Sequence, residues 1–249
     1  MKSTKDYSAY LKEKFPPKEE FVSRMEALIG KVDAKEFFEI SYTPTPNSIR
    51  CNTIKLPVEE LKKRLEGYGW KLKQPFKDFP EVMIIKNKLN PGELGKTKEH
   101  LLGYYYVQEI SSMLPMLVLR PKEGEVILDL CASPGSKTTQ AAAMMKNGGT
   151  IVANEVNMGR IGILNSNLER CGVMNTIVTR KEGSALCNAV YKKSRMRFDK
   201  ILVDAPCSGT GTIMKSLRTI RMWNPGMIKN LSGIQKRLLD AAWGILKKG

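Results

Sequence analysis

Four short apolar runs in the second half of the chain constrain its fold more than any other feature. They begin at residues 125, 150, 175 and 200 and read "EVILDL", "TIVANE", "NTIVTR" and "KILVDA". Patterns with helical spacing lie between them at 137–146 and 158–171. β-branched runs that alternate with helices are typical of a parallel sheet covered on both faces. We therefore predict an α/β fold with a Rossmann-like, doubly wound sheet and ligands at the carboxyl ends of its strands.

The first third of the chain predicts a separate, smaller α+β unit. Residues 18–39 place apolar side chains at helical spacing, interrupted at Gly30, which indicates a pair of helices. Short strands follow at 48–54 and 81–85, with an amphipathic helix between them that opens on Pro57. Small sheets with one helical face occur in RNA-binding appendages and also as simple packing units, so both roles stay open. We predict two domains, residues 1–98 and 99–249.

The chain is strongly basic, and the excess is uneven. It has 41 Lys and Arg against 25 Asp and Glu, a formal net charge of +16. Residues 121–249 hold 20 of the basic and 9 of the acidic side chains. Such an excess attracts polyanions, which makes RNA or DNA a candidate partner, while a protein kept soluble by its lysines is the alternative.

The cysteines and the single histidine argue against a metal centre. The five cysteines lie far apart without a C-x-x-C pair, and the histidine is His100, so we expect neither a zinc site nor a disulfide framework. No apolar run approaches the roughly 20 residues that span a bilayer, and the first residues lack the core of a signal peptide. We expect a cytoplasmic protein with no metal and no membrane association.

A loop of small residues follows the first predicted strand. In "DLCASPGSKTTQ" small side chains let a ligand approach the backbone amides at the start of the next helix. A phosphate loop is excluded by spacing, because Ser136 separates Gly135 from Lys137 and position 130 is Leu. The dinucleotide fingerprint G-x-G-x-x-G is also missing. The pattern favours a nucleoside cofactor without pyrophosphate.

Acidic residues end or follow the other predicted strands. Glu155 ends the second strand, where a carboxylate can accept both ribose hydroxyls, although an acid at a strand end is also ordinary. Arg160 either pairs with Glu155 or faces solvent. Glu182, after the third strand, stands where an adenine edge could be read. Asp204 ends the fourth strand and either works in the crevice or caps the next turn.

Cys207 follows Asp204 in the segment "VDAPCSGTG". Pro206 helps to end the strand, because proline cannot donate to a ladder. We predict that Cys207 and Asp204 face the same crevice as the cofactor loop. The alternative for Cys207 is a small buried apolar residue.

Taken together, "QEISSMLP", "LDLCASPGSKTTQ", "ANE" with Arg160, "VDAPCSGTG", and "WNP" followed by "QKRLLDAAWGILKKG" resemble the RNA cytosine-C5 methyltransferase family of the Sun/RsmF type. The resemblance covers roughly residues 40–249. It implies a methyltransferase that depends on S-adenosylmethionine, acts on tRNA or rRNA, and carries a small N-terminal domain of RNA-recognition-like shape. A non-catalytic RNA-binding module that keeps the cofactor fold is the alternative function.

The resemblance also implies roles for individual residues. In this family the segment that matches 131–137 holds the cofactor, Glu155 matches the ribose-binding acid, and Glu182 stands where an aspartate is usual. Asp204 matches the acid that holds the cytosine ring, and Cys207 the cysteine that assists release of the methylated RNA. The cofactor-binding residues that we predict are Cys131, Ala132, Ser133, Pro134, Gly135, Ser136, Lys137, Glu155, Arg160, Glu182 and Asp204, and the catalytic residues are Asp204 and Cys207.

The attacking thiolate of this family comes from a Thr-Cys pair at the end of the next strand. We expect that strand beyond Gly249, so the predicted sheet is incomplete, with about four or five of seven strands, and the chain is expected to be a fragment. An open edge of apolar residues on strand four supports this expectation, and a partner chain that completes the sheet is the alternative. The predicted behaviour of residues 1–249 is cofactor binding without methyl transfer.

Overall fold

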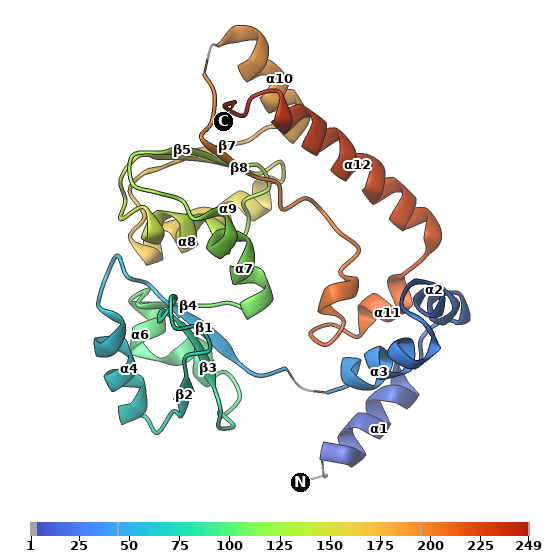
Figure 1. Ribbon diagram of the computed structural model, residues 1–249. Helices are drawn as coiled ribbons and strands as arrows, with labels where there is room; N and C mark the ends of the chain where they lie inside the picture. Colours follow the sequence, from blue (N-terminus) through green and yellow to red (C-terminus); the bar gives the residue numbers. More distant parts are fainter. Residues whose placement is uncertain (1–3, 44, 195, 249) are drawn as a thin grey trace. The chain divides into compact units, whose positions relative to one another are not determined.

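The computed structural model describes residues 4–43, 45–194 and 196–248 (Figure 1). The chain divides into two compact units, each built from two separate segments. The larger unit consists of Pro46–Ala205 and Arg237–Gly249, and the smaller one joins the residues up to Thr45 with Pro206–Lys236. The predicted domain boundary between residues 98 and 99 stays a prediction.

A parallel sheet forms the centre of the larger unit. Its strands are β5 (Val126–Asp129), β6 (Thr150–Asn154), β7 (Thr176–Thr179) and β8 (Lys200–Leu202). Their order in the sheet is β7-β6-β5-β8, and every pair is parallel. The chain moves outward from β5 to β7 and then returns to the other side of β5. This reversal defines the topological switch point at which ligands of doubly wound folds bind, and it confirms the predicted fold class.

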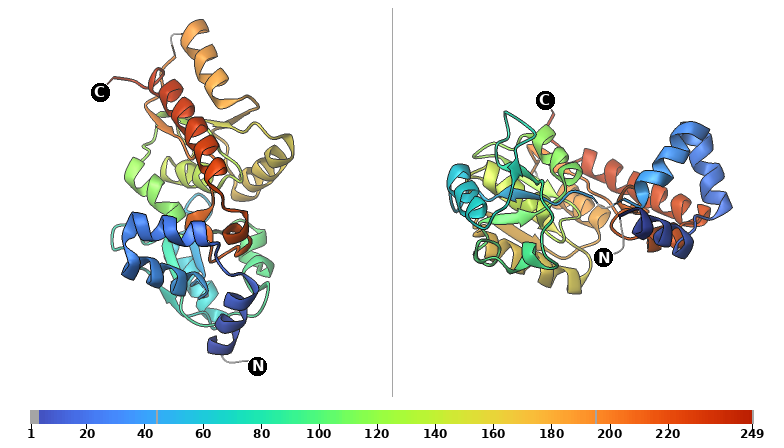
Figure 2. Two further views of the ribbon diagram at one scale, coloured as in Figure 1. Left: turned by 90° about the vertical axis from the view of Figure 1, so that its right-hand side faces the viewer. Right: turned by 90° about the horizontal axis from the view of Figure 1, so that it is seen from below.

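Helices cover both faces of this sheet. They are α7 (Ile110–Leu119), α8 (Ser136–Met144), α9 (Met158–Cys171), α10 (Gly183–Lys193) and the end of α12 (Pro225–Trp243). Ile151 and Ala153, which share one face of β6, pack with residues of α8 and α9. Figures 1 and 2 show α10 beside the end of α12 on the opposite face. Helices α10 and α12 pack closely at Gly183, where a Cβ would lie 2.6 Å from Cδ2 of Leu238.

A small antiparallel sheet precedes the parallel one in the same unit. Its strands are β1 (Ser48–Cys51), β2 (Leu72–Lys73), β3 (Val82–Ile85) and β4 (Tyr105–Val107), in the order β2-β3-β1-β4. Helix α4 (Val58–Gly67) buries Leu61 and Leu65 against one face of the sheet, and the short helices α5 (Glu93–Lys96) and α6 (Lys98–Leu101) lead into β4. Strand β1 ends earlier than the predicted 48–54, because the Asn52 amide donates to the Gly103 and Cys171 carbonyl oxygens at 2.8 and 2.7 Å.

The smaller unit is helical. It contains α1 (Thr4–Lys14), α2 (Glu19–Ile29), α3 (Lys31–Ser41), the single turn η1 (Thr210–Thr212), α11 (Arg218–Met222) and the first part of α12. Gly30, at φ 83°, separates α2 from α3, so the predicted helix pair is confirmed. The core joins the two segments of the unit, with the rings of Phe21 and Trp223 5.0 Å apart.

Candidate cofactor-binding site

The loop from β5 to α8 turns on Gly135. This residue has φ 99°, which L side chains rarely adopt, and a Cβ there would lie 3.0 Å from Cδ1 of Leu164. Gly135 is also the N-cap of α8, and no side chain caps the helix. The first main-chain N–H groups of α8 therefore remain as donors at the carboxyl end of β5.

The loop is fastened to the neighbouring strand and helix. The Ala132 N–H donates to the Asn154 carbonyl oxygen at 2.8 Å. The Ser133 hydroxyl donates to the Arg160 carbonyl oxygen at 2.9 Å, and the Arg160 guanidinium donates back to the Ser133 carbonyl oxygen. Asn167 donates to the Pro134 carbonyl oxygen at 2.9 Å. Since these carbonyl groups are engaged with α9, the loop is held in one geometry by the protein alone.

Asn154 ties together the ends of three strands. Its amide nitrogen donates to the carbonyl oxygens of Leu130 and Lys181, at 3.2 and 2.9 Å. Its amide oxygen accepts from the Thr179 hydroxyl at 3.0 Å and the Lys181 N–H at 3.1 Å. Asn154 was not predicted as a site residue, because its partners come from loops on both sides of β6.

Glu155 directly follows β6 and is only 3% exposed. One carboxylate oxygen accepts from the Asn157 N–H at 2.9 Å, and the other lies 3.5 Å from Nη1 of Arg160. Arg160 thus pairs with Glu155, which decides between the two alternatives left open by the sequence. A buried carboxylate held by one main-chain donor and one cation keeps lone pairs for further donors, such as a pair of hydroxyls.

Glu182 is the N-cap of α10. Its carboxylate accepts from the Ser184 hydroxyl at 2.6 Å and from the Ala185 N–H at 2.8 Å. The hydrogen bond from Ser184 is the main reason why the pKa of Glu182 lies below its ordinary value. The structure therefore gives this side chain a local role in starting a helix, and its predicted contact with a cofactor stays a prediction.

Lys137 and Asp204 form an ion pair at the carboxyl ends of β5 and β8. Nζ of Lys137 lies 2.8 Å from Oδ2 of Asp204 and donates to the Ser112 hydroxyl at 3.1 Å. The Lys137 side chain is 12% exposed, whereas that of Asp204 is 52% exposed. The acid therefore stands at the open side of the site with its cation behind it. The sequence placed both residues in the site without predicting that they pair.

Asp129, the last residue of β5, is buried beside this pair. Its carboxylate accepts from the Thr138 hydroxyl at 2.7 Å. The pKa of Asp129 is raised to about 6, mainly by burial; the hydrogen bond from Thr138 opposes the shift, the negative charge of Asp204 adds to it, and Lys137 opposes it. Asp129 was missed by the sequence analysis, although its position at a strand end, directly before the loop, was a usable signal.

The two cysteines of the predicted site differ. Cys131 is half-buried in the loop, and its pKa is raised to about 12 by burial and then by the charges of Asp129, Glu155 and Asp204. These three carboxylates therefore surround one loop in the larger unit. Cys207 is exposed and belongs to the smaller unit. The structure thus brings the loop, Glu155, Arg160 and Asp204 together, and the shared crevice predicted for Cys207 stays a prediction.

Arg50 supports the site from the small sheet and was not predicted. It is 1% exposed and donates to the Ser136 carbonyl oxygen at 2.8 Å and the Thr139 hydroxyl at 2.9 Å. It also donates to the Gln108 side chain. Gln108 in turn donates to the Ser112 carbonyl oxygen at 3.1 Å, next to the hydroxyl that receives Lys137. A chain of polar contacts therefore runs from the small sheet to the Lys137–Asp204 pair.

Two further observations concern the chain as far as it is described. No group of three or more His, Cys, Asp or Glu side chains among the described residues is placed to hold a metal ion. None of the described helices combines the length and the apolar character needed to cross a membrane.

The doubly wound sheet, with a donor loop after its first strand and an acid after its second, defines the fold of an S-adenosylmethionine-dependent methyltransferase. Residues 116–249 match the family model of the 16S rRNA methyltransferase RsmB/F, and residues 17–110 match that of the N-terminal domain of the 16S rRNA methyltransferase RsmF. The chain belongs to the RsmB/F family of methyltransferases. The predicted Sun/RsmF type of methyltransferase and its cofactor, S-adenosylmethionine, are thereby confirmed.

Individual relatives agree with this assignment. The chain is 36% identical over 233 residues to ribosomal RNA small subunit methyltransferase F of Vibrio parahaemolyticus, which covers 92% of the chain and 48% of the relative. The corresponding protein of Aliivibrio salmonicida is 40% identical over 227 residues, covering 90% and 47%. The chain thus spans about half the length of the curated relatives it matches.

Solved structures show the same fold. A methyltransferase homolog protein from Pyrococcus horikoshii is 34% identical, with a TM-score of 0.81 over 97% of this chain and 74% of the other. NSun6 from Pyrococcus horikoshii, solved with SFG, has a TM-score of 0.82 at 21% identity, over 93% of this chain and 81% of the other.

Proposed function

We propose that the chain binds S-adenosylmethionine at the β5–α8 loop and serves methyl transfer to C5 of cytosine in ribosomal RNA. The names of the relatives support rRNA over tRNA. The observation that carries the proposal is the Lys137–Asp204 pair, with 2.8 Å between Nζ and Oδ2, at the carboxyl ends of the strands beside that loop. A carboxyl group there can contact a base that enters from solvent, because Asp204 is half-exposed.

The residues of the site fit a nucleoside cofactor. The uncapped start of α8 offers main-chain donors, and the buried Glu155 offers an acceptor for ribose hydroxyls. Gly135 has no side chain, so the loop packs closely against Leu164 of α9. When bound, S-adenosylmethionine supplies an electrophilic methyl group. The protein supplies the binding site for this cofactor, and we assign the orientation of its ribose to Glu155.

The chemistry of cytosine gives Asp204 its proposed task. Carbon 5 of cytosine is a poor nucleophile, and addition of a thiolate to carbon 6 makes it reactive. A carboxyl group that hydrogen-bonds N3 of the ring stabilises the charge that develops during this addition. We assign that contact to the protonated carboxyl group of Asp204, which can donate to N3, with Lys137 holding the side chain in place. Cys207 is assigned to product release.

Calorimetric titration with S-adenosylmethionine tests the cofactor site. We expect the wild-type chain to bind and Glu155→Gln to bind about tenfold more weakly or worse, because a charged acceptor for two hydroxyls is lost. Glu169→Gln, an exposed acid on α9, is the matched control and should bind as the wild type does. Absence of heat with the wild-type chain would refute the proposal.

Mass spectrometry of rRNA incubated with the chain and S-adenosylmethionine tests the assignment of the cysteines. We expect no 5-methylcytosine from residues 1–249 alone. Formation of 5-methylcytosine that is lost in Cys207→Ser would instead make Cys207 the nucleophile. A methyl group found on another base would contradict the proposed substrate.

A further inference from the structure

The segment between Asp204 and Asp240 has an unusual charge. Residues 205–239 contain six basic side chains and no acidic one. Most of this segment belongs to the smaller unit, where the other segment, up to Thr45, has eight basic and eight acidic side chains. The positive charge of the smaller unit therefore comes from one of its two segments. A basic segment without acids attracts a polyanion such as RNA.

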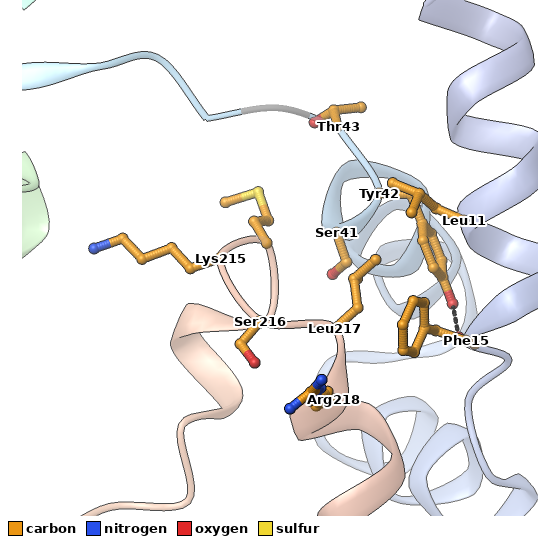
Figure 3. A pocket seen from close by; sticks show the side chains of 10 residues that line it. Leu11, Phe15, Ser41, Tyr42, Thr43, Lys215, Ser216, Leu217 and Arg218 are labelled. Atoms are coloured by element: carbon orange, nitrogen blue, oxygen red, sulfur yellow. Dashed lines mark hydrogen bonds between the residues drawn. The ribbon is translucent and has the colours of Figure 1, made fainter. Parts of the chain in front are cut away.

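A cavity of about 420 Å³ lies in the smaller unit, between its two segments (Figure 3). Its size falls within the range of sites for small organic ligands and is large enough for one nucleoside. It is lined by Leu11, Phe15, Ser41, Tyr42, Thr43, Met214, Lys215, Ser216, Leu217 and Arg218. Five of these residues come from the segment 205–239, which has no acidic side chain. The basic segment therefore forms one wall of the cavity.

The lining is divided by chemical character. Figure 3 shows the rings of Phe15 and Tyr42 close together, Leu217 beside Ser41, and Ser216 and Lys215 on the side away from the two rings. The Tyr42 hydroxyl donates to the Phe15 carbonyl oxygen at 2.7 Å, so its proton is not available to a ligand. Tyr42 is buried, so the apolar surface offered to a base consists of Leu217 and the Phe15 ring, over which the Arg221 guanidinium lies 5.1 Å from the centroid.

The polar groups of the cavity are suited to the two polar parts of a nucleotide. The Ser41 and Thr43 hydroxyls donate to the carbonyl oxygens of Phe37 and Ile40, both at 2.7 Å, so their remaining lone pairs can accept from the N–H groups of a base. Arg218 is exposed, and its guanidinium has no hydrogen bond or ion pair to any residue that the structure describes. Such a guanidinium is available to a phosphate group, which it can bind through two parallel hydrogen bonds.

We propose that this cavity receives one unpaired nucleotide of the substrate RNA, with its base against Phe15 and Leu217 and its phosphate on Arg218. The inference rests on the proposed function, because it takes RNA as the substrate. It adds a contact outside the cofactor loop and predicts a preference for RNA with an unpaired nucleotide over continuous duplex. Recognition of unpaired bases by stacking beside a cation is a general means of binding RNA.

Fluorescence anisotropy with two labelled RNAs tests the proposal: a hairpin with an unpaired loop and a fully paired duplex of equal length. We expect Ser216→Trp, which places a large side chain in the cavity from an exposed position, to weaken hairpin binding about tenfold and duplex binding much less. Arg218→Ala should weaken hairpin binding and lower the slope of log K against log salt concentration by about 0.7–0.9. Lys35→Ala, an exposed lysine of α3 outside the cavity, removes the same charge and is the matched control.

The outcomes separate this inference from the proposed function. Equal effects of Arg218→Ala and Lys35→Ala on hairpin binding, or wild-type binding by Ser216→Trp, would overturn the nucleotide site. Calorimetry with S-adenosylmethionine on the same variants should give the wild-type affinity, which shows that they are folded. A wild-type chain that binds the cofactor and neither RNA overturns the nucleotide site alone. A wild-type chain that prefers the hairpin and gives no heat with the cofactor supports the site and refutes the proposed cofactor function.

Discussion

The guanidinium of Arg50 donates to the main-chain carbonyl oxygen of Ser136 at 2.8 Å, across 86 residues of sequence. One residue is in the small antiparallel sheet, and the other is the first residue of α8. The helix that carries the cofactor loop is therefore fixed by a buried cation of the preceding sheet.

We expect Arg50→Met to destabilise the protein by about 2–4 kcal/mol, because several buried acceptors lose their donor. It should also weaken binding of S-adenosylmethionine. Arg64→Met removes an exposed arginine that forms an ion pair with Glu60 on its own helix and lies over the Tyr104 ring, 5.5 Å from its centroid, and we expect a change of at most about 1 kcal/mol. Urea unfolding measures both variants. Equal stability of the two would contradict the supporting role of Arg50.

The charges around Asp129 predict two opposite shifts of its pKa. Lys137→Met removes a cation and should raise the pKa of Asp129 above about 6, whereas Asp204→Asn removes a like charge and should lower it. Lys146→Met, at an exposed lysine after α8, should leave the value unchanged. NMR titration of the carboxyl carbon measures the pKa. Shifts of the same sign in the first two variants would show that the charge arrangement is wrong.

Asp129 also predicts how stability depends on pH. Its folded pKa, about 6, lies above the ordinary value of 3.8, so the folded state binds more protons between these values. Stability should therefore fall as pH rises from about 4 to about 6, by an amount on the order of 3 kcal/mol from this group. Asp129→Asn should remove that dependence in urea unfolding across this range. A variant that keeps the wild-type dependence would contradict the raised pKa.

Asp199 provides a contrast of opposite sign. A hydrogen bond from Lys247 lowers its pKa below 3.8, so its stabilising contribution is present above that value and is lost as pH falls through the lowered pKa. Asp199→Asn should therefore change the acid limb of the stability curve below about pH 4 and leave the range between 4 and 6 as in the wild type.

Gly103 predicts a local steric effect. It has φ 70°, and a Cβ there would lie 1.8 Å from the Arg170 carbonyl oxygen, so Gly103→Ala requires movement of backbone. We expect a loss of about 2 kcal/mol or more. Gly67→Ala, in a helix and with no atom within 4 Å of the added Cβ, should be neutral or stabilising by about 0.5–1 kcal/mol. Thermal unfolding of both variants tests this difference.

The sequence predicted those parts of the structure that depend on local pattern. The parallel strands and the helix break at Gly30 follow from periodicity and from glycine, and both are confirmed. The residues selected at strand ends follow from the same local pattern, and their roles in a site stay predictions.

The support behind the site could not be predicted in this way. The packing of the two sheets connects Arg50 to Lys137 through Gln108 and Ser112. No local sequence pattern encodes that packing. The charged Arg50 inside the apolar strand "SIRC" was the one available signal, because a buried charge needs partners. Likewise, the sequence pattern suggested that the Glu182 carboxylate is available to a ligand. In the structure this carboxylate caps the N-terminus of α10.

The four hydrogen bonds of the Asn154 amide have a thermodynamic consequence. Every donor and acceptor of that side chain is already satisfied by protein atoms, so these bonds hold the three strand ends in place before a small molecule binds. A ligand that binds at these strand ends should therefore cost less conformational entropy than one that has to order a mobile loop.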